Sequence, residues 1–148
     1  MSGQLAQGDW FAREQLHRAV RDGDVREMRR LLDAGFSQQL FDDLSRTPLH
    51  YAVEGEHYRA AALLLDAGVP VNLHEADKIG ETPLSLAVQG EYVEMVALLL
   101  RHGADPDIPG WMGLTARLRA HKRKDQVGRQ IAALLARHAP ACARKSPA

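Results

Sequence analysis

Three groups of side chains in this sequence have types and spacings that could support chemistry. The first is His138 with Cys142, the only cysteine, four residues later. A histidine that deprotonates a nearby thiol makes a nucleophile, but this pair has no third residue in a recognisable motif to orient it. The sequence also lacks a Gly-rich phosphate loop, an HExxH motif and a GxSxG motif. We therefore expect no enzymatic activity and predict no catalytic residue.

The second group could bind a metal ion. His74, Glu75 and Asp77 bring one imidazole and two carboxylates together within four residues. A structural metal site usually takes four protein ligands, and no fourth ligand follows at a motif spacing. We therefore interpret these residues as a polar loop and expect neither a metal nor another cofactor.

The third group is a basic run that could contact phosphates: Arg117, Arg119, His121, Lys122, Arg123 and Lys124. No nucleic-acid-binding motif accompanies it. Lys plus Arg and Asp plus Glu both number 19, so the net charge is zero and no global field attracts a polyanion. A solvated face is the favoured interpretation, and nucleic-acid binding is kept as the weaker alternative.

The elements that must position these side chains are pairs of short helices. Thr82 is a good N-cap and Pro83 suits the first helical position, so one helix is predicted to begin here. A second is predicted from about Tyr92 to Gly103, with apolar residues at helical spacing. Helices this short are unstable alone in water, so their apolar faces must be covered by the rest of the chain.

The same helix pair recurs along the chain with a period of 33 to 35 residues. The segment from Thr47 to Gly68 matches the segment from Thr82 to Gly103, and the segment from Leu16 to Gly35 matches again. With this period, the TPLH at Thr47–His50 and the LLLDAG at Leu63–Gly68 resemble the ankyrin repeat family, whose units are a β-turn followed by two antiparallel helices.

The resemblance implies an all-α solenoid of about four β-turn and helix-turn-helix units, with degenerate capping repeats at both ends. We expect an N-terminal arm over residues 1–8, an ankyrin repeat domain over 9–138 and a disordered tail over 139–148. The repeats are predicted at about 9–41, 42–76, 77–109 and 110–138, with two added residues around His121–Asp125 in the last. The family pattern also implies a hydrogen bond between His50 and Thr47, a bond that Ser85 cannot reproduce in the third unit.

Ankyrin units resemble one another in binding macromolecules through their β-turn fingertips and the exposed side of each first helix. Carried over by position, this surface comprises Trp10, Phe11, Arg13, Asp43, Leu44, Arg46, Tyr51, Glu54, Lys78, Ile79, Glu81, Leu86, Gln89, Trp111, Met112 and Leu114. It is unusually apolar for turns in water and holds both tryptophans, a composition typical of interface cores.

Two interpretations of the aromatic residues remain open. Trp10 and Phe11 either bind a partner or cap the first unit. For Trp111 and Met112 the binding interpretation is favoured, because Gly110 and Gly113 bracket them in a turn that buries little.

The expected function is therefore recognition of a protein partner by an adaptor or regulator. The alternative is a dedicated inhibitor, such as a bacterial immunity protein that neutralises a toxin enzyme. We expect no small-molecule substrate. We also expect no membrane association, because no apolar run is longer than Ala60–Leu65, which is far shorter than the roughly 20 residues of a membrane span. A single cysteine and the absence of a signal-peptide pattern favour a cytoplasmic location. The balanced charge and the capped ends favour a monomer.

Overall fold

The computed structural model describes residues 14–35, 41, 44, 46–74 and 80–137, and these contain helices and no strands. A helix at residues 14–21 precedes α2 (Val25–Asp33). The later pairs are α3 (Pro48–Glu54) with α4 (Tyr58–Asp66), α5 (Pro83–Ala87) with α6 (Val93–Arg101), and α7 (Ala116–Lys122) with α8 (Gln126–Ala136). A short 3₁₀ turn, η1 (Trp111–Gly113), comes before α7. The predicted all-α solenoid is confirmed.

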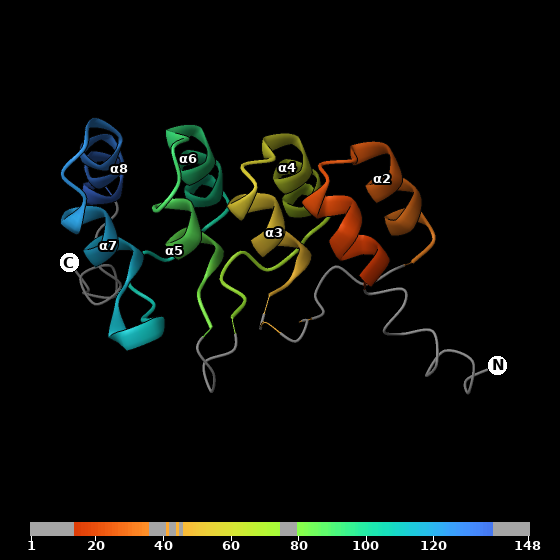
Figure 1. Ribbon diagram of the computed structural model, residues 1–148, viewed down its shortest axis with the longest axis horizontal. Helices are drawn as coiled ribbons and strands as arrows, with labels where there is room; N and C mark the ends of the chain where they lie inside the picture. The colour runs from red at the N-terminus through yellow and green to blue at the C-terminus, as the bar shows by residue number, and fades with distance from the viewer. Residues whose placement is uncertain (1–13, 36–40, 42–43, 45, 75–79, 138–148) are drawn as a thin grey trace, which may run out of the picture.

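The helices form two layers (Figure 1). The second helix of each pair, α2, α4, α6 and α8, lies in one layer, and the first helices lie in the other. The described part of the loop between α6 and α7, with η1, projects away from the layers. Each pair packs on the next, α3 against α5 and α5 against α7, and α6 packs against α8. The stack therefore has an edge of fingertip loops along one side and an open face at each end.

One continuous core runs between the layers. Leu31, Leu64 and Leu99 occupy the same place in successive second helices and are fully buried. Leu49 and Leu84 do the same in the first helices. The repeat period predicts this pattern, because neighbouring units must cover each other's apolar face.

Local capping explains where the helices begin and end. The Thr82 hydroxyl accepts a hydrogen bond from the Ser85 N–H at 3.1 Å, and Pro83 follows it at the first helical position. Gly103 follows α6 with a φ of 90°, a left-handed conformation that glycine adopts without steric cost. The predicted start and end of this unit are confirmed.

The predicted position of the two added residues in the fourth unit is wrong. The N-caps of the paired helices, Thr47 and His57 in one unit and Thr115 and Asp125 in the last, are equally far apart in sequence. The added residues instead lengthen the second helix, which has 9 residues in α4 and α6 and 11 in α8. Matching the leucine pairs by offset could not reveal this, because a longer helix and a longer loop shift the pattern equally.

Two histidines tie successive units together. His50 Nδ1 lies 3.0 Å from the Thr47 N and 2.8 Å from its hydroxyl, which confirms the predicted bond. Its Nε2 lies 2.6 Å from the Glu81 carbonyl oxygen in the next unit, as His17 Nε2 lies 3.1 Å from that of Arg46. At the equivalent Ser85, the buried hydroxyl has no hydrogen-bond partner among the described residues. The histidine bridge is therefore missing between the third and fourth units.

Replacing Ser85 with histidine is expected to restore this bridge. The new imidazole ring would accept a hydrogen bond from the Thr82 N–H and donate one to the Leu114 carbonyl. These bonds should raise the free energy of unfolding by about 1 kcal/mol. Urea denaturation of the full chain measures the change. Ser85→Ala is the control, because it removes the unsatisfied hydroxyl without adding a bridge. A histidine variant no more stable than the alanine variant would show that no bridge forms.

Candidate protein-binding surface

The predicted surface residues divide into those that the structure describes and those that it does not. Leu44, Arg46, Tyr51, Glu54, Glu81, Leu86, Gln89, Trp111, Met112 and Leu114 are described. The other predicted residues lie outside the described part of the chain: Trp10, Phe11, Arg13, Asp43, Lys78 and Ile79. Eight of the described residues fall into two groups, one in each half of the stack, whereas Leu44 is 68% exposed and Leu86 is partly buried against the core.

The group in the N-terminal half surrounds Tyr51. The guanidinium carbons of Arg21 and Arg46 lie 5.9 and 5.8 Å from the centre of its ring, within the range of cation–π attraction. Arg46 is also paired with Glu54, and these residues line a shallow pocket of about 240 Å³. Arg21 was missed by the sequence-based selection. The repeat offset of 33 residues that relates it to Glu54 is the signal that would have found it.

The group in the C-terminal half is the η1 fingertip, where Trp111 is 48% and Met112 75% exposed. Met112 has φ 58° and ψ 23°, a left-handed conformation uncommon for residues other than glycine. Gly113 follows it, also with a positive φ of 71°. The tight turn therefore projects two large apolar side chains into solvent, as the bracketing glycines predict.

Glu81 fixes this fingertip from beneath. Its Oε1 accepts hydrogen bonds from the Trp111 N–H at 3.2 Å and from Arg119 Nη2 at 2.5 Å. The Glu81 and Arg119 side chains are each only 16% exposed. A Cβ atom on Gly110 would approach Glu81 Oε2 to 2.5 Å, so a larger residue there would force the Glu81 carboxylate to move. Glu81 thus holds the fingertip, although the sequence placed it among the contacting residues.

A hollow of about 340 Å³ lies beside the fingertip, between the third and fourth units. Its lining consists of Gln89, Leu114, Arg119, Lys122 and Arg123. Three of these five side chains are cationic and none is a carboxylate. Leu114 joins the hollow to η1, because its N–H donates to the Trp111 carbonyl at 3.2 Å.

Half of the residues of the basic run make ion pairs and hydrogen bonds within the protein. Arg117 pairs with Asp107 at 2.8 Å and donates to the Leu135 carbonyl, and Arg119 pairs with Glu81. The exposed members that remain are His121, Lys122 and Lys124. The six basic residues look alike along the chain, whereas the fold leaves three of them to solvent.

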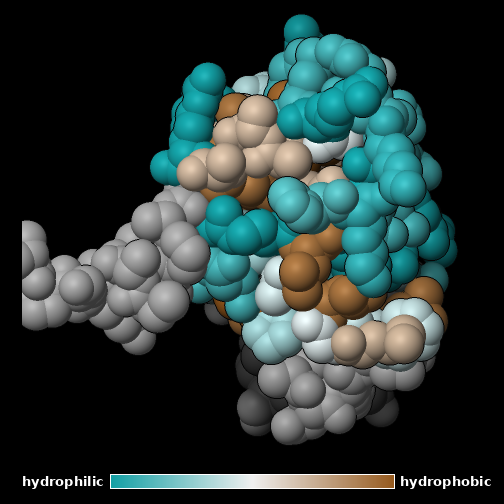
Figure 2. Space-filling view, turned by 90° about the vertical axis from the view of Figure 1, so that its left-hand side faces the viewer, coloured by the Kyte–Doolittle hydropathy of each residue, from teal (hydrophilic) through white to brown (hydrophobic). Residues whose placement is uncertain are grey.

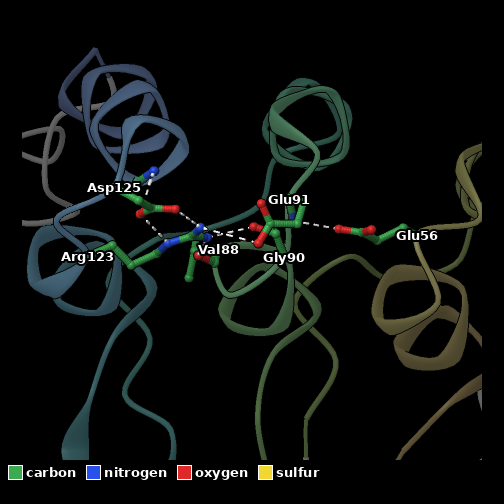
Figure 3. Close-up of polar contacts among 7 residues, drawn as sticks. Glu56, Val88, Gly90, Glu91, Arg123 and Asp125 are labelled. Carbon is green, nitrogen blue, oxygen red and sulfur yellow. Dashed lines mark hydrogen bonds and ion pairs between the residues drawn. The ribbon is translucent and has the colours of Figure 1, made fainter.

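Arg123 links the fourth unit to the third (Figure 3). Its Nη1 donates to the Val88 and Gly90 carbonyls at 2.9 and 2.6 Å, while its other nitrogens bind Asp125. Hydrogen bonding to Arg123 lowers the pKa of the Asp125 carboxyl below its usual value. The same carboxylate accepts the Gly128 N–H at the start of α8, so one ion pair joins a helix cap to the neighbouring unit.

A family model of ankyrin repeats (3 copies) matches residues 16–110, more than half of the chain. This chain belongs to the ankyrin repeat family. The resemblance seen in the TPLH and LLLDAG segments is confirmed, and ankyrin repeats are protein-interaction modules. The matched segment ends at the glycine before η1, yet α7 and α8 continue the same stack beyond it.

Two curated plant proteins share part of the sequence. A probable E3 ubiquitin-protein ligase, XBOS32 of Oryza sativa subsp. japonica, is 39% identical over 62 residues, which are 40% of this chain and 12% of that protein. The E3 ubiquitin-protein ligase XBAT32 of Arabidopsis thaliana is 36% identical over 62 residues, with the same coverage. The chain thus spans a small part of the length of these relatives.

The described part of this ankyrin array contains neither a group of metal ligands nor a helix that could span a membrane. Across residues 14–35, 41, 44, 46–74 and 80–137, no three His, Cys, Asp or Glu side chains are grouped as metal ligands. None of the described helices is long and apolar enough to cross a membrane. Of the three loop residues for which a metal site was considered and not predicted, Glu75 and Asp77 lie outside this part of the chain. His74 is within it, and its Nδ1 lies 3.1 Å from the Asn72 carbonyl oxygen.

The end of the array formed by α7 and α8 carries an apolar strip bordered by hydrophilic side chains (Figure 2). A hollow of about 200 Å³ lies there, lined by Arg117, Leu118, His121, Ala132, Leu135 and Ala136. Arg117 occupies the place of the core leucines Leu49 and Leu84, and its bonds to Asp107 and the Leu135 carbonyl close the end of the core. The fourth unit therefore ends the core with a satisfied cation, as a capping repeat requires.

Proposed function

We propose that this ankyrin repeat protein binds a protein partner through its third and fourth units and catalyses no reaction itself. We call the contacting residues the fingertip surface: Gln89, Trp111, Met112, Leu114 and Lys122. The observation that carries the proposal is the backbone of Met112, which is left-handed while 75% of the residue is exposed.

The left-handed backbone of Met112 lowers the stability of the folded protein. A left-handed residue other than glycine costs roughly 1–2 kcal/mol, and glycine would relieve that cost. The exposed Met112 side chain gains little burial in return. Backbone strain of this kind gathers at binding sites, where the position of the side chain matters more than its contribution to folding.

The neighbouring residues give the fingertip surface the character of an interface core. Tryptophan, methionine and arginine are enriched in the cores of protein interfaces. A buried aromatic anchor often supplies most of the binding free energy. The Trp111 backbone N–H is bound to the Glu81 carboxylate, so the turn that carries the anchor is positioned before the partner arrives. Such preorganisation lowers the entropy lost on binding.

Removing the two anchors is expected to weaken binding with little effect on folding. The partner would be captured from the native host and purified, and its affinity measured by calorimetry with the Trp111→Ala and Met112→Gly variants. We expect a loss of about 2 kcal/mol for Trp111→Ala. Met112→Gly should also weaken binding while leaving the melting temperature equal or higher, since glycine relieves the strain. Unchanged affinities with lowered melting temperatures would assign both residues to folding.

The nature of the partner decides between an adaptor and a dedicated inhibitor. The protein would use the same fingertip surface in both cases. Only as an inhibitor would it abolish an enzymatic activity of the partner on binding. The names of the two plant relatives do not extend ubiquitin ligase activity to this chain, because the matches cover 12% of each.

A further inference from the structure

We infer that the partner segment bound at the fingertip surface carries a carboxylate next to an apolar side chain. The apolar group contacts Trp111 and Met112, and the carboxylate enters the hollow beside Lys122. This inference rests on the proposed function and specifies the chemistry of its partner.

The charges around the hollow favour a carboxylate. Two of its three cations are already neutralised, Arg119 by Glu81 and Arg123 by Asp125. The Lys122 side chain is exposed and makes no ion pair or hydrogen bond with other residues of the described structure. Its charge is the one that the lining leaves uncompensated, and a single carboxylate matches it.

The hollow and the fingertip are close enough for one segment to contact both. Leu114 belongs to the lining and is hydrogen-bonded to Trp111 within η1. On the other side, Glu81 contacts both Arg119 in the lining and the Trp111 N–H. A partner side chain that covers Trp111 therefore places its neighbours at the hollow, where Lys122 becomes partly desolvated and its attraction to an anion grows.

The surroundings disfavour the phosphates of a nucleic acid. A strand of phosphates needs several free cations in a row, each releasing counterions. Here the adjacent arginines are paired, and the carboxylates of Glu91 and Asp125 lie around Arg123 at 3.8 and 2.5 Å from its Nη2. A strand of phosphates that passes Arg123 would meet these charges, whereas a single carboxylate needs only one cation, Lys122.

The experiment selects binders for the full chain from a phage-displayed library of random dodecapeptides. Enriched sequences are expected to carry Asp or Glu within a few positions of a large apolar residue. Synthetic peptides are then titrated by fluorescence in a Trp10→Phe background, where Trp111 is the sole tryptophan. Lys122→Glu should weaken binding about tenfold, and selection on that variant should instead enrich Lys and Arg. Lys124→Glu is the matched control, with an expected change of less than about twofold.

The outcomes distinguish failure of the inference from failure of the proposed function. Peptides that depend on Trp111 and Met112, but lack acidic residues or bind Lys122→Glu as tightly, overturn this inference and leave the proposed function standing. Peptides that ignore both anchors, or a selection without any binder, overturn the proposed function and the inference together. A single-stranded oligonucleotide could also displace the peptide, bind the protein more tightly than the peptide does and depend on Lys122. That result would show that the site prefers a phosphate, and it would overturn the inferred carboxylate.

Discussion

Replacing Leu99 with alanine is expected to lower the free energy of unfolding by about 2–5 kcal/mol. Leu99 is fully buried, and Leu64 has the same place and burial in the preceding unit. Each substitution removes the contacts of a packed side chain and leaves a cavity that two flanking units cannot readily fill, because the helices on both sides are fixed by their own cores. Urea denaturation followed by far-UV circular dichroism measures the loss.

The control for this prediction is Leu118→Ala. Leu118 is also helical, but 48% of it is exposed, so its truncation should cost no more than about 0.5 kcal/mol. A loss at Leu99 or Leu64 as small as the loss at Leu118 would contradict the assigned core. Because an array of repeats can unfold in steps, the slope of the denaturation curve should be compared between variants as well.

The second large effect is expected from Glu81→Ala, which should destabilise the protein by about 2–3 kcal/mol. The substitution leaves the mostly buried Arg119 without its counter-charge and takes the acceptor from the Trp111 N–H. Breaking a fully buried pair costs about 3–5 kcal/mol, and the value here is lower because each partner is 16% exposed. Chemical denaturation gives the stability, and Trp111 fluorescence in the Trp10→Phe background reports the fingertip.

A double-mutant cycle separates the ion pair from the anchor of the turn. Glu81→Ala combined with Arg119→Ala should be less destabilising than the sum of the single changes. The reason is that each single variant leaves one buried charge unpaired, whereas the double variant leaves none. Glu81→Gln should keep an acceptor for the Trp111 N–H and leave the fluorescence close to that of the parent. Additive effects in the cycle, with unchanged fluorescence in Glu81→Ala, would mean that the carboxylate does not hold η1.

These contacts give the junction between the third and fourth units a different chemistry from the others. Between the first units a histidine ring bridges to the next backbone, whereas here Ser85 stands in its place. The connection is made instead by Arg119 to Glu81 and by Arg123 to two carbonyls of the third unit. The same ion pair that replaces the missing bridge also positions Trp111, so stacking and presentation of the anchor depend on one another.

Much of the fold could be predicted because its signals are local. The Thr-Pro start, the apolar spacing and the glycine at the end of α6 act within a few residues, so the sequence alone indicates where the unit around Thr82 begins and ends. The longer α8 could not be placed in this way. A helix grows until its packing or its cap stops it, and the neighbouring unit decides that.

The candidate surface was only partly predictable, and the basic run shows why. Along the chain, Arg117, Arg119 and Arg123 look like Lys122, but their partners are carboxylates and carbonyls brought to them by folding. Which cation stays free is a property of contacts between units. The role of Glu81 beneath the fingertip, 30 residues before Trp111, was hidden for the same reason.

The sequence by itself determined the repeat, the helix pairs, the core leucines and the glycine-bracketed turn that exposes Trp111 and Met112. Each of these follows from residue type and spacing. The tertiary structure decided that Met112 is left-handed, that Glu81 and Arg119 hold the turn, and that Lys122 is the uncompensated cation of the hollow. Charge pairing and backbone strain depend on distances between segments far apart in the chain, and only the stacked units set those distances.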